Sequence, residues 1–313
     1  MPDTQRPVRL MFVDDESRIL RSLALQFRKD YEVLTESDPH LALHRLEQEP
    51  IDILVSDQRM PAMNGAELLA RARALQPQGI RILLTGYSDV DAAIQALNDG
   101  EIFRYLTKPW NPREMDDTIA RAAELSLRQR AARAAPAGAA AGADIPHGIA
   151  ILLLDGDPLV EARVLELCAV DGHHLHRARQ VDEAIAILNR EHVDIVISDL
   201  RLGEHATAPL LKSLAQVRPH ALTIVTTPYQ DTQALLALIN QAQIFRYVLK
   251  PVSVKLFERA LHAAVTQSRH WRARPQAVVA RAAEAPRDEG ERAAVNGLVG
   301  MLGRLRGRFG APV

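Results

Sequence analysis

The stretch Ile-Phe-Arg-Tyr-Leu-Thr-Lys-Pro at residues 102–109 recurs at residues 244–251 as Ile-Phe-Arg-Tyr-Val-Leu-Lys-Pro. Four pairs of polar residues share the same separation of 142 positions: Asp57 and Asp199, Thr85 and Thr227, Tyr105 and Tyr247, Lys108 and Lys250. This constant spacing indicates that the chain contains one domain twice. Each copy collects carboxylates, a hydroxyl and a lysine, a combination that suits a metal ion and a phosphoryl group.

Length and composition narrow the class of protein. The chain has 313 residues, enough for two domains of ordinary size, and a net charge of −1 that gives no general attraction to nucleic acid or membrane. Its single cysteine, Cys168, excludes an intramolecular disulfide. Neither a signal peptide nor an apolar run of membrane-spanning length is recognisable, so we expect a cytoplasmic protein without a transmembrane span.

Short apolar runs alternate with longer amphipathic segments. In the first copy, the expected strands are 9–13, 32–35, 52–56, 81–84 and 103–106, and the expected helices are 16–29, 39–48, 66–75, 90–98 and 112–130. In the second copy, the expected strands are 150–154, 175–178, 194–198, 222–226 and 245–249, and the expected helices are 159–170, 181–190, 208–216, 231–240 and 253–270. The alternation predicts an α/β fold, with a doubly wound, five-stranded parallel sheet in each copy.

Composition divides the chain into four parts. A first domain covers 1–132, a linker rich in Ala, Gly and Pro covers 133–148, a second domain covers 149–272, and an Arg- and Ala-rich tail covers 273–313. We expect the tail to be a disordered, solubilising segment with a short helix, because its glycines weaken the helical spacing of its apolar residues. Docking to a partner or membrane, and contact with nucleic acid through its arginines, are the alternatives.

In the first copy, polar candidates lie where the expected strands end. They are Asp14 and Asp15 after the first strand, Asp57 after the third, Thr85 after the fourth and Lys108 just past the fifth. Because the carboxyl ends of parallel strands meet at one edge of a sheet, we expect these side chains to converge.

This set, together with the stretch Val55-Ser-Asp-Gln-Arg-Met-Pro-Ala-Met-Asn-Gly65, resembles the receiver domain of bacterial two-component response regulators, which is flavodoxin-like. The resemblance covers about 10–130 and 149–270. It implies that Asp57 accepts a phosphoryl group from a histidine kinase or a phosphotransfer protein. It also implies that Mg²⁺ binds to Asp14, Asp15, Asp57 and the backbone carbonyl of Arg59. A hard cation would offset the repulsion among these carboxylates.

The resemblance assigns roles to the remaining residues of the first copy. Lys108, joined by a cis bond to Pro109, would pair with a phosphoryl oxygen, and Thr85 would donate its hydroxyl. Tyr105 would swing inward as Thr85 moves. The signal would then pass through the face at 88–130 to an unknown protein target or to a second copy of the chain.

Two residues near the expected phosphorylation site should influence the lifetime of the phosphorylated form. Arg59 and Tyr87 are placed to shield an acyl phosphate from water, so we expect slow self-dephosphorylation. No nucleotide-binding motif or familiar output domain is recognisable, so we expect no output enzyme.

The second copy departs from the pattern. Gly156 replaces the acid equivalent to Asp15, and Leu202-Gly-Glu-His205 replaces the Met-Pro segment, so the loop after Asp199 must have a different shape. We interpret Asp157 as a helix N-cap. The retained residues are Asp199, Thr227, Lys250 and Tyr247, and Asp155 with Asp199 would form a weaker metal site.

Three functional hypotheses follow. The leading one is a tandem-receiver response regulator that works in a phosphorelay through protein contacts, with impaired phosphorylation of its second domain. In the second, the second domain is an adaptor that binds a partner without phosphorylation. In the third, the basic tail contacts nucleic acid, a partner that the net charge disfavours.

Overall fold

The computed structural model describes residues 6–86, 90–134, 148–228, 232–273, 283–284, 286 and 288–303. Its contacts divide the chain into two units, residues 1–138 and 139–313, and each unit holds one five-stranded parallel sheet. Most of the expected linker, at 135–147, lies outside the described residues.

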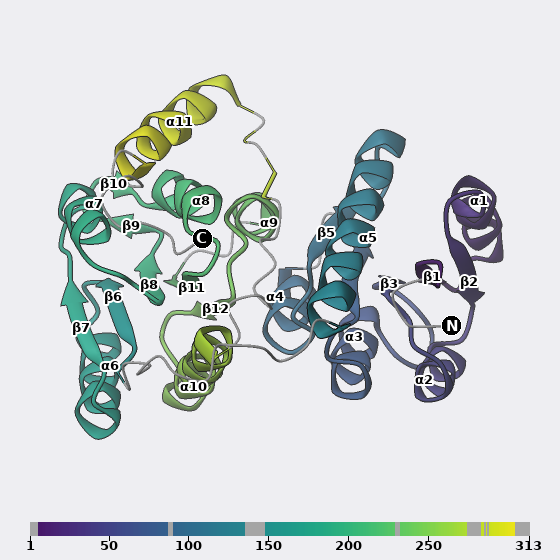
Figure 1. Cartoon of the computed structure of the whole chain (residues 1–313), viewed down its shortest axis with the longest axis horizontal. Helices are drawn as coiled ribbons and strands as arrows, with labels where there is room; N and C mark the ends of the chain where they lie inside the picture. The colour runs from purple at the N-terminus through teal and green to yellow at the C-terminus, as the bar shows by residue number, and fades with distance from the viewer. Residues whose placement is uncertain are drawn as a thin grey trace. The chain divides into compact units, whose positions relative to one another are not determined.

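The first unit has the strand order β2-β1-β3-β4-β5. Its strands are β1 (Arg9–Val13), β2 (Glu32–Glu36), β3 (Ile53–Asp57), β4 (Ile80–Thr85) and β5 (Arg104–Thr107). Its helices are α1 (Ser17–Phe27), α2 (Pro39–Gln48), α3 (Gly65–Leu75), α4 (Val90–Asn98) and α5 (Pro112–Ala134). Helices α2, α3 and α4 cover one face of the sheet, and α1 and α5 cover the other (Figure 1).

The second unit repeats this order as β7-β6-β8-β11-β12. Its sheet strands are β6 (Ala150–Leu154), β7 (His174–Arg177), β8 (Ile195–Asp199), β11 (Leu222–Thr227) and β12 (Arg246–Leu249). Its helices begin with α6 (Pro158–Asp171), α7 (Val181–Arg190), α8 (Ala208–Val217), α9 (Thr232–Ala237) and α10 (Val254–Ala273). The prediction of two flavodoxin-like, doubly wound sheets in tandem is therefore confirmed.

Two local features of the second unit differ from expectation. The expected helix at 231–240 is wrong in its second half, because α9 continues as a π-helix, η2 (Leu238–Ala242). All five residues of η2 are buried, so packing overrides the α-helical hydrogen-bond pattern there. After β8, the chain forms a short antiparallel hairpin of β9 (Arg201–Leu202) and β10 (His205–Ala206).

The described part of the tail contains a helix, as the expectation of a short helix allowed. Residues Glu289–Gly303 form a helix, α11, that packs against α8 and α7 (Figure 1). Val295 is fully buried and Leu302 is 3% exposed, so burial of apolar side chains stabilises a helix that local propensity disfavours. The arginines at 304, 306 and 308 lie outside the described residues.

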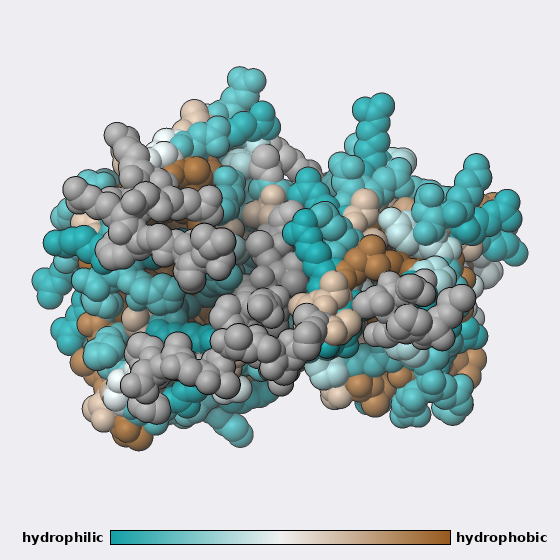
Figure 2. Space-filling view, in the orientation of Figure 1, coloured by the Kyte–Doolittle hydropathy of each residue, from teal (hydrophilic) through white to brown (hydrophobic). Residues whose placement is uncertain are grey.

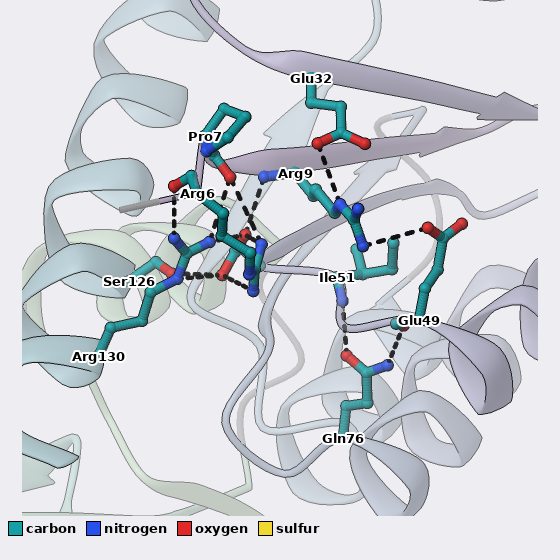
Figure 3. Close-up of polar contacts among 10 residues, drawn as sticks. Arg6, Pro7, Arg9, Glu32, Glu49, Ile51, Gln76, Ser126 and Arg130 are labelled. Atoms are coloured by element: carbon teal, nitrogen blue, oxygen red, sulfur yellow. Dashed lines mark hydrogen bonds and ion pairs between the residues drawn. The ribbon is translucent and has the colours of Figure 1, made fainter. Parts of the chain in front are cut away.

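Strands and helices together supply the apolar core of each unit, and hydrophilic residues predominate among the coloured residues of the visible face (Figure 2). Each unit has a buried charge cluster where its central strand, β3 or β8, begins. In the first unit, Arg130 Nε donates to Asp52 Oδ1 at 2.9 Å, and Arg6 Nη1 lies 2.7 Å from Asp52 Oδ2 (Figure 3). In the second unit, Arg272 Nε donates to Asp194 Oδ1 at 2.8 Å.

These two clusters are equivalent, because Asp52 and Asp194, like Arg130 and Arg272, are 142 positions apart. Each cluster fastens the end of a long helix to the start of a central strand. Both pairs follow the constant spacing of 142 positions, although neither was predicted from the sequence. Among the described helices, none combines the length and apolar character needed to cross a membrane.

Candidate functional site

Three carboxylates meet at the carboxyl edge of the first sheet. Asp14 and Asp15 directly follow β1, and Asp57 is the last residue of the neighbouring strand β3. One oxygen of each lies within 4.8 Å of the other two. Asp14 and Asp57 are buried, whereas Asp15 is exposed. A compact all-oxygen set of this kind fits a hard divalent cation such as Mg²⁺.

Lys108 supplies the positive charge of this pocket. Its Nζ lies 2.8 Å from Asp14 Oδ2 and 2.5 Å from Asp57 Oδ1. Burial works to lower the pKa of Lys108, but the hydrogen bonds to both carboxylates outweigh it and raise the pKa. The amine is therefore held in its charged form. The peptide bond between Lys108 and Pro109 is cis, as the resemblance implies.

The carboxyl group of Asp57 is largely shielded from solvent. Burial raises the pKa of its carboxyl, Lys108 opposes this rise, and the charge of Asp14 adds to it. Its Oδ2 accepts a hydrogen bond from the backbone N–H of Arg59 at 2.9 Å. One oxygen thus faces the lysine, and the other is oriented by the loop that follows β3.

The loop after Asp57 folds back and brings Gly65 close to the end of β3. The backbone N–H of Gly65 donates to the carbonyl of Gln58 at 3.0 Å, and a Cβ at Gly65 would lie only 2.1 Å from the carbonyl oxygen of Asp57. Glycine is therefore required at this position for the backbone to approach Asp57 so closely.

The remaining predicted residues of the first pocket come from β4 and β5. Asp57 pairs in register with Leu84, so Thr85 lies one residue further along the neighbouring strand. The hydroxyl of Thr85 donates to the carbonyl of Gly86 at 3.3 Å, and the ring of Tyr105 is already buried, at 1% exposure. The side chain of Arg59 is exposed, and Tyr87 lies outside the described residues. Slow self-dephosphorylation therefore stays a prediction.

The second pocket keeps the lysine but changes the acids around it. Lys250 Nζ lies 2.7 Å from both Asp155 Oδ1 and Asp199 Oδ2, and its bond to Pro251 is cis. Burial works to lower the pKa of Lys250, but the two carboxylates outweigh it and raise the pKa. Thr227 and Tyr247 are buried, like their counterparts. Within the described residues, no group of three carboxylates forms here.

Asp157 is the third acid near this lysine, but it serves α6. Its Oδ1 accepts a hydrogen bond from the backbone N–H of Leu159 at 2.9 Å, which confirms the prediction of a helix N-cap. Its Oδ2 remains 4.0 Å from Lys250 Nζ. The position that should carry the metal-binding acid is Gly156, where a Cβ would meet nothing within 4 Å. The missing carboxylate is therefore not a consequence of crowding.

A threonine that the sequence reasoning missed completes the second pocket. The hydroxyl of Thr226 donates to Asp155 Oδ2, while Asp155 Oδ1 accepts from Lys250 and from the backbone N–H of Asp157. The residue aligned with Thr226 in the first unit is Leu84, which has no hydroxyl. The polar Thr226 at a position where the first copy has an apolar leucine could have indicated this hydrogen bond from the sequence.

The loop after Asp199 has the different shape that the sequence predicts. Thr207 stands where the first unit has Gly65, and its hydroxyl donates to the carbonyl of Asp199 at 2.5 Å. The β9–β10 hairpin occupies the intervening residues. The side chain of Thr207 thus lies beside the Asp199 carbonyl, whereas in the first unit the backbone of Gly65 lies close to the Asp57 carbonyl.

Comparison with known proteins assigns the family. The model of the response regulator receiver domain matches residues 10–120 and 151–262, which is most of the chain. The chain belongs to the response regulator receiver family. Both units are therefore receivers, and phosphorelay signalling is the general activity of this family.

The curated relatives include two hydrogenase transcriptional regulatory proteins HoxA. The one from Bradyrhizobium diazoefficiens is 30% identical over 213 residues, which cover 66% of this chain and 41% of that protein. The one from Cupriavidus necator is 36% identical over 124 residues, covering 40% of this chain and 25% of that protein. The chain thus spans less than half the length of these relatives. Their names count against our expectation that nucleic acid is an unlikely partner.

Among solved structures, the signal receiver domain of an HD domain-containing protein from Pseudomonas fluorescens is similar to part of the chain. It has 34% sequence identity and a TM-score of 0.39, and it covers 41% of this chain and 94% of that chain.

Proposed function

We propose that this protein is a response regulator in which Asp57 accepts a phosphoryl group from a histidine kinase or a phosphotransfer protein. The observation that carries the proposal is the contact of Lys108 Nζ with both Asp14 and Asp57, beside a third carboxylate, Asp15. This arrangement gathers the nucleophile, a fixed positive charge and an all-oxygen cation site at one sheet edge. Phosphoryl transfer depends mainly on such positioning and charge compensation.

The transfer can be written from the residues of this pocket. A carboxylate oxygen of Asp57 attacks phosphorus, an O–P bond forms, and the N–P bond of the donor phosphohistidine breaks as the imidazole leaves. Lys108 neutralises negative charge on the phosphoryl oxygens, and the Arg59 N–H orients the attacking carboxylate. Bound Mg²⁺ would be held by Asp14, Asp15, Asp57 and the carbonyl of Arg59, and would supply further charge neutralisation.

The response to phosphorylation would run through Thr85 and Tyr105. The Thr85 hydroxyl makes a long hydrogen bond of 3.3 Å to its neighbour, and we infer that it is available to reorient toward a phosphoryl oxygen. Movement of this strand end would alter the face at 88–130. That face would contact a downstream protein or a second copy of the chain, and the chain would act as a phosphoacceptor with weak phosphatase activity rather than as an output enzyme.

For the second receiver, we propose a binding role without phosphorylation. Asp155 accepts from Lys250 and from a backbone N–H, as Asp14 does from Lys108 and from a backbone N–H, but Asp155 also accepts from Thr226, and Asp199 is paired with Lys250. In this pocket, protein groups therefore pair with the charges of both carboxylates. The first pocket has a third carboxylate, Asp15, in addition. The self-compensated second pocket has little to gain from a cation or a phosphoryl group.

Phosphorylation of the full chain with a small-molecule phosphodonor and Mg²⁺ tests both assignments. Asp57→Asn should abolish the acid-labile phosphoprotein, whereas Asp199→Asn should leave its amount unchanged, as measured by phosphate-affinity gel electrophoresis. Label that persists in Asp57→Asn would refute the assignment of the phosphoacceptor. Label that falls by half in Asp199→Asn would refute only the binding role of the second receiver.

The third hypothesis, contact with nucleic acid, is favoured by the names of the relatives, which are transcriptional regulatory proteins. Gel-shift titration of the full chain on duplex DNA at two salt concentrations tests it. Binding that weakens steeply with salt would support it.

A further inference from the structure

Helix α11 has no counterpart among the described residues of the first receiver. It lies along α8 and touches α7, on the far side of these helices from the sheet (Figure 1). The second unit thereby gains an additional helical layer. We propose that the α7–α8 surface is a helix-binding site, and that α11 is its built-in, releasable occupant.

The polar side chains of α8 are adapted to this occupant. The side chain of Lys212 is 4% exposed, and its amine contacts the carboxylate of Glu291 on α11. Ser213 is fully buried, and its hydroxyl lies 2.7 Å from the carbonyl oxygen of Pro209 in its own helix and 3.1 Å from that of Val295 on α11. Because α11 covers Lys212, burial of its ammonium would be costly without a carboxylate partner, so a helix that occupies this surface must bring an acid.

The first receiver shows what the same positions look like without an occupant. Ala70 aligns with Lys212, and Arg71 aligns with Ser213. The side chain of Arg71 is 53% exposed and pairs within its own helix, with Glu67. The anchors on α8 are therefore a property of the second unit and not of the receiver fold.

On α11, the contacting residues follow one face of the helix. Glu291, Val295 and Leu302 are spaced by four and seven residues, which places them on one side. Asn189 Nδ2 on α7 adds a hydrogen bond of 3.4 Å to the carbonyl of Met301, near the end of the helix. The site therefore recognises an amphipathic helix with an acid in its first turn and aliphatic residues behind it.

The glycines of α11 point to a helix that forms only when docked. Gly297 and Gly300 are exposed, and a Cβ at either position would meet nothing within 4 Å. Packing therefore does not require glycine at these two positions. Both residues weaken the free helix, so undocking and unfolding of α11 are coupled, and release does not need the receiver to open.

Tail residues before α11 also reach the π-helix. The backbone N–H of Glu284 donates to the carbonyl of Asn240 at 3.2 Å, within η2. In the first unit, α4 occupies the equivalent place and has no π segment. The tail therefore contacts η2 as well as the α7–α8 surface.

Hydrogen exchange on the full chain tests whether α11 is releasable. Amides of 289–303 should exchange faster than the buried amides of α8, and Gly297→Ala/Gly300→Ala should slow them by roughly tenfold, because two glycines cease to oppose the helix. Equal exchange rates in α11 and α8 would overturn the proposal, because the helix would then open only with the whole unit.

Peptide binding tests the surface itself. Val295→Asp should release α11, with Asn296→Asp, on the exposed side of the same helix, as the matched control. A fluorescent peptide of residues 288–303 carrying Gly297→Ala and Gly300→Ala should bind the Val295→Asp chain at least about tenfold more tightly than the Asn296→Asp chain. Adding Lys212→Ala should abolish this binding. Equal binding to both chains, or binding to neither, would overturn the proposal.

Discussion

The hydroxyl of Thr226 on β11 donates a hydrogen bond to the carboxylate of Asp155 after β6, across the intervening strand β8. In the first receiver, Leu84 stands at the aligned position, and the corresponding acid, Asp14, is left beside Asp15 and Asp57. The second receiver thus has one carboxylate fewer and one additional internal hydrogen bond at the same sheet edge. This difference leads to the first prediction.

Restoring the missing groups should create a second metal site. In Gly156→Asp/Thr226→Leu, a third carboxylate enters open space and the competing hydroxyl is removed. Titration calorimetry should show a rise from about one bound Mg²⁺ per chain to about two. Adding Asp199→Asn to the double variant should remove the additional site. An unchanged stoichiometry would show that the first-pocket geometry depends on more than these two positions.

The two lysines should respond differently to Mg²⁺. Lys250→Ala leaves the buried Asp155 beside Asp199 and should destabilise the second unit by about 3 kcal/mol, with no recovery on adding Mg²⁺. Lys108→Ala removes the charge that pairs with Asp14 and Asp57, but a bound cation should compensate for it. Thermal unfolding with and without Mg²⁺ distinguishes the two pockets, and recovery of Lys250→Ala by Mg²⁺ would contradict this account.

The buried Asp52 cluster should make the first unit sensitive to acid. Burial alone would raise the pKa of Asp52, but hydrogen bonds from Arg6, from the Arg9 backbone and from Arg130 outweigh it and lower the pKa. Because the folded pKa lies below the unfolded value of about 4, this carboxylate contributes stability above that pH and loses it as the pH falls further.

Asp52→Asn should therefore lower the free energy of unfolding of the first unit by about 3 kcal/mol at neutral pH. Below about pH 4, the free energies of unfolding of the variant and of the wild type should become more similar. Urea unfolding followed by Trp110 fluorescence in a Trp271→Phe background reports on the first unit, which contains Trp110. Glu67→Gln, on the surface of α3, is the control and should change stability by less than about 0.5 kcal/mol. A difference that is independent of pH would argue against the ion pair.

Gly65 should be essential, whereas Gly86 should tolerate alanine. A Cβ at Gly65 would overlap the carbonyl oxygen of Asp57, so the backbone must shift, at a cost of about 1–3 kcal/mol, and the phosphoacceptor loop must move. A Cβ at Gly86 would meet nothing within 4 Å. Phosphorylation rate and thermal stability should both fall in Gly65→Ala and stay near wild type in Gly86→Ala. Normal phosphorylation of Gly65→Ala would show that this loop adapts.

The sequence by itself determined the duplication, the two doubly wound sheets and the set of polar residues at the strand ends. These follow from local patterns, because alternating apolar strands and amphipathic helices allow few topologies, and parallel strands bring their carboxyl ends to one edge. Asp14, Asp57 and Lys108 could therefore be placed together before their distances were known.

Only the tertiary structure decided which long-range partners these residues have. The bond from Thr226 to Asp155 joins residues 71 positions apart, and the cluster of Asp52 with Arg130 joins residues 78 apart. No local pattern encodes such pairings, because they depend on which strands and helix ends become neighbours. Helix α11 is the clearest case: its glycines predict a weak helix, and burial of Val295 and Leu302 against the second receiver reverses that local preference.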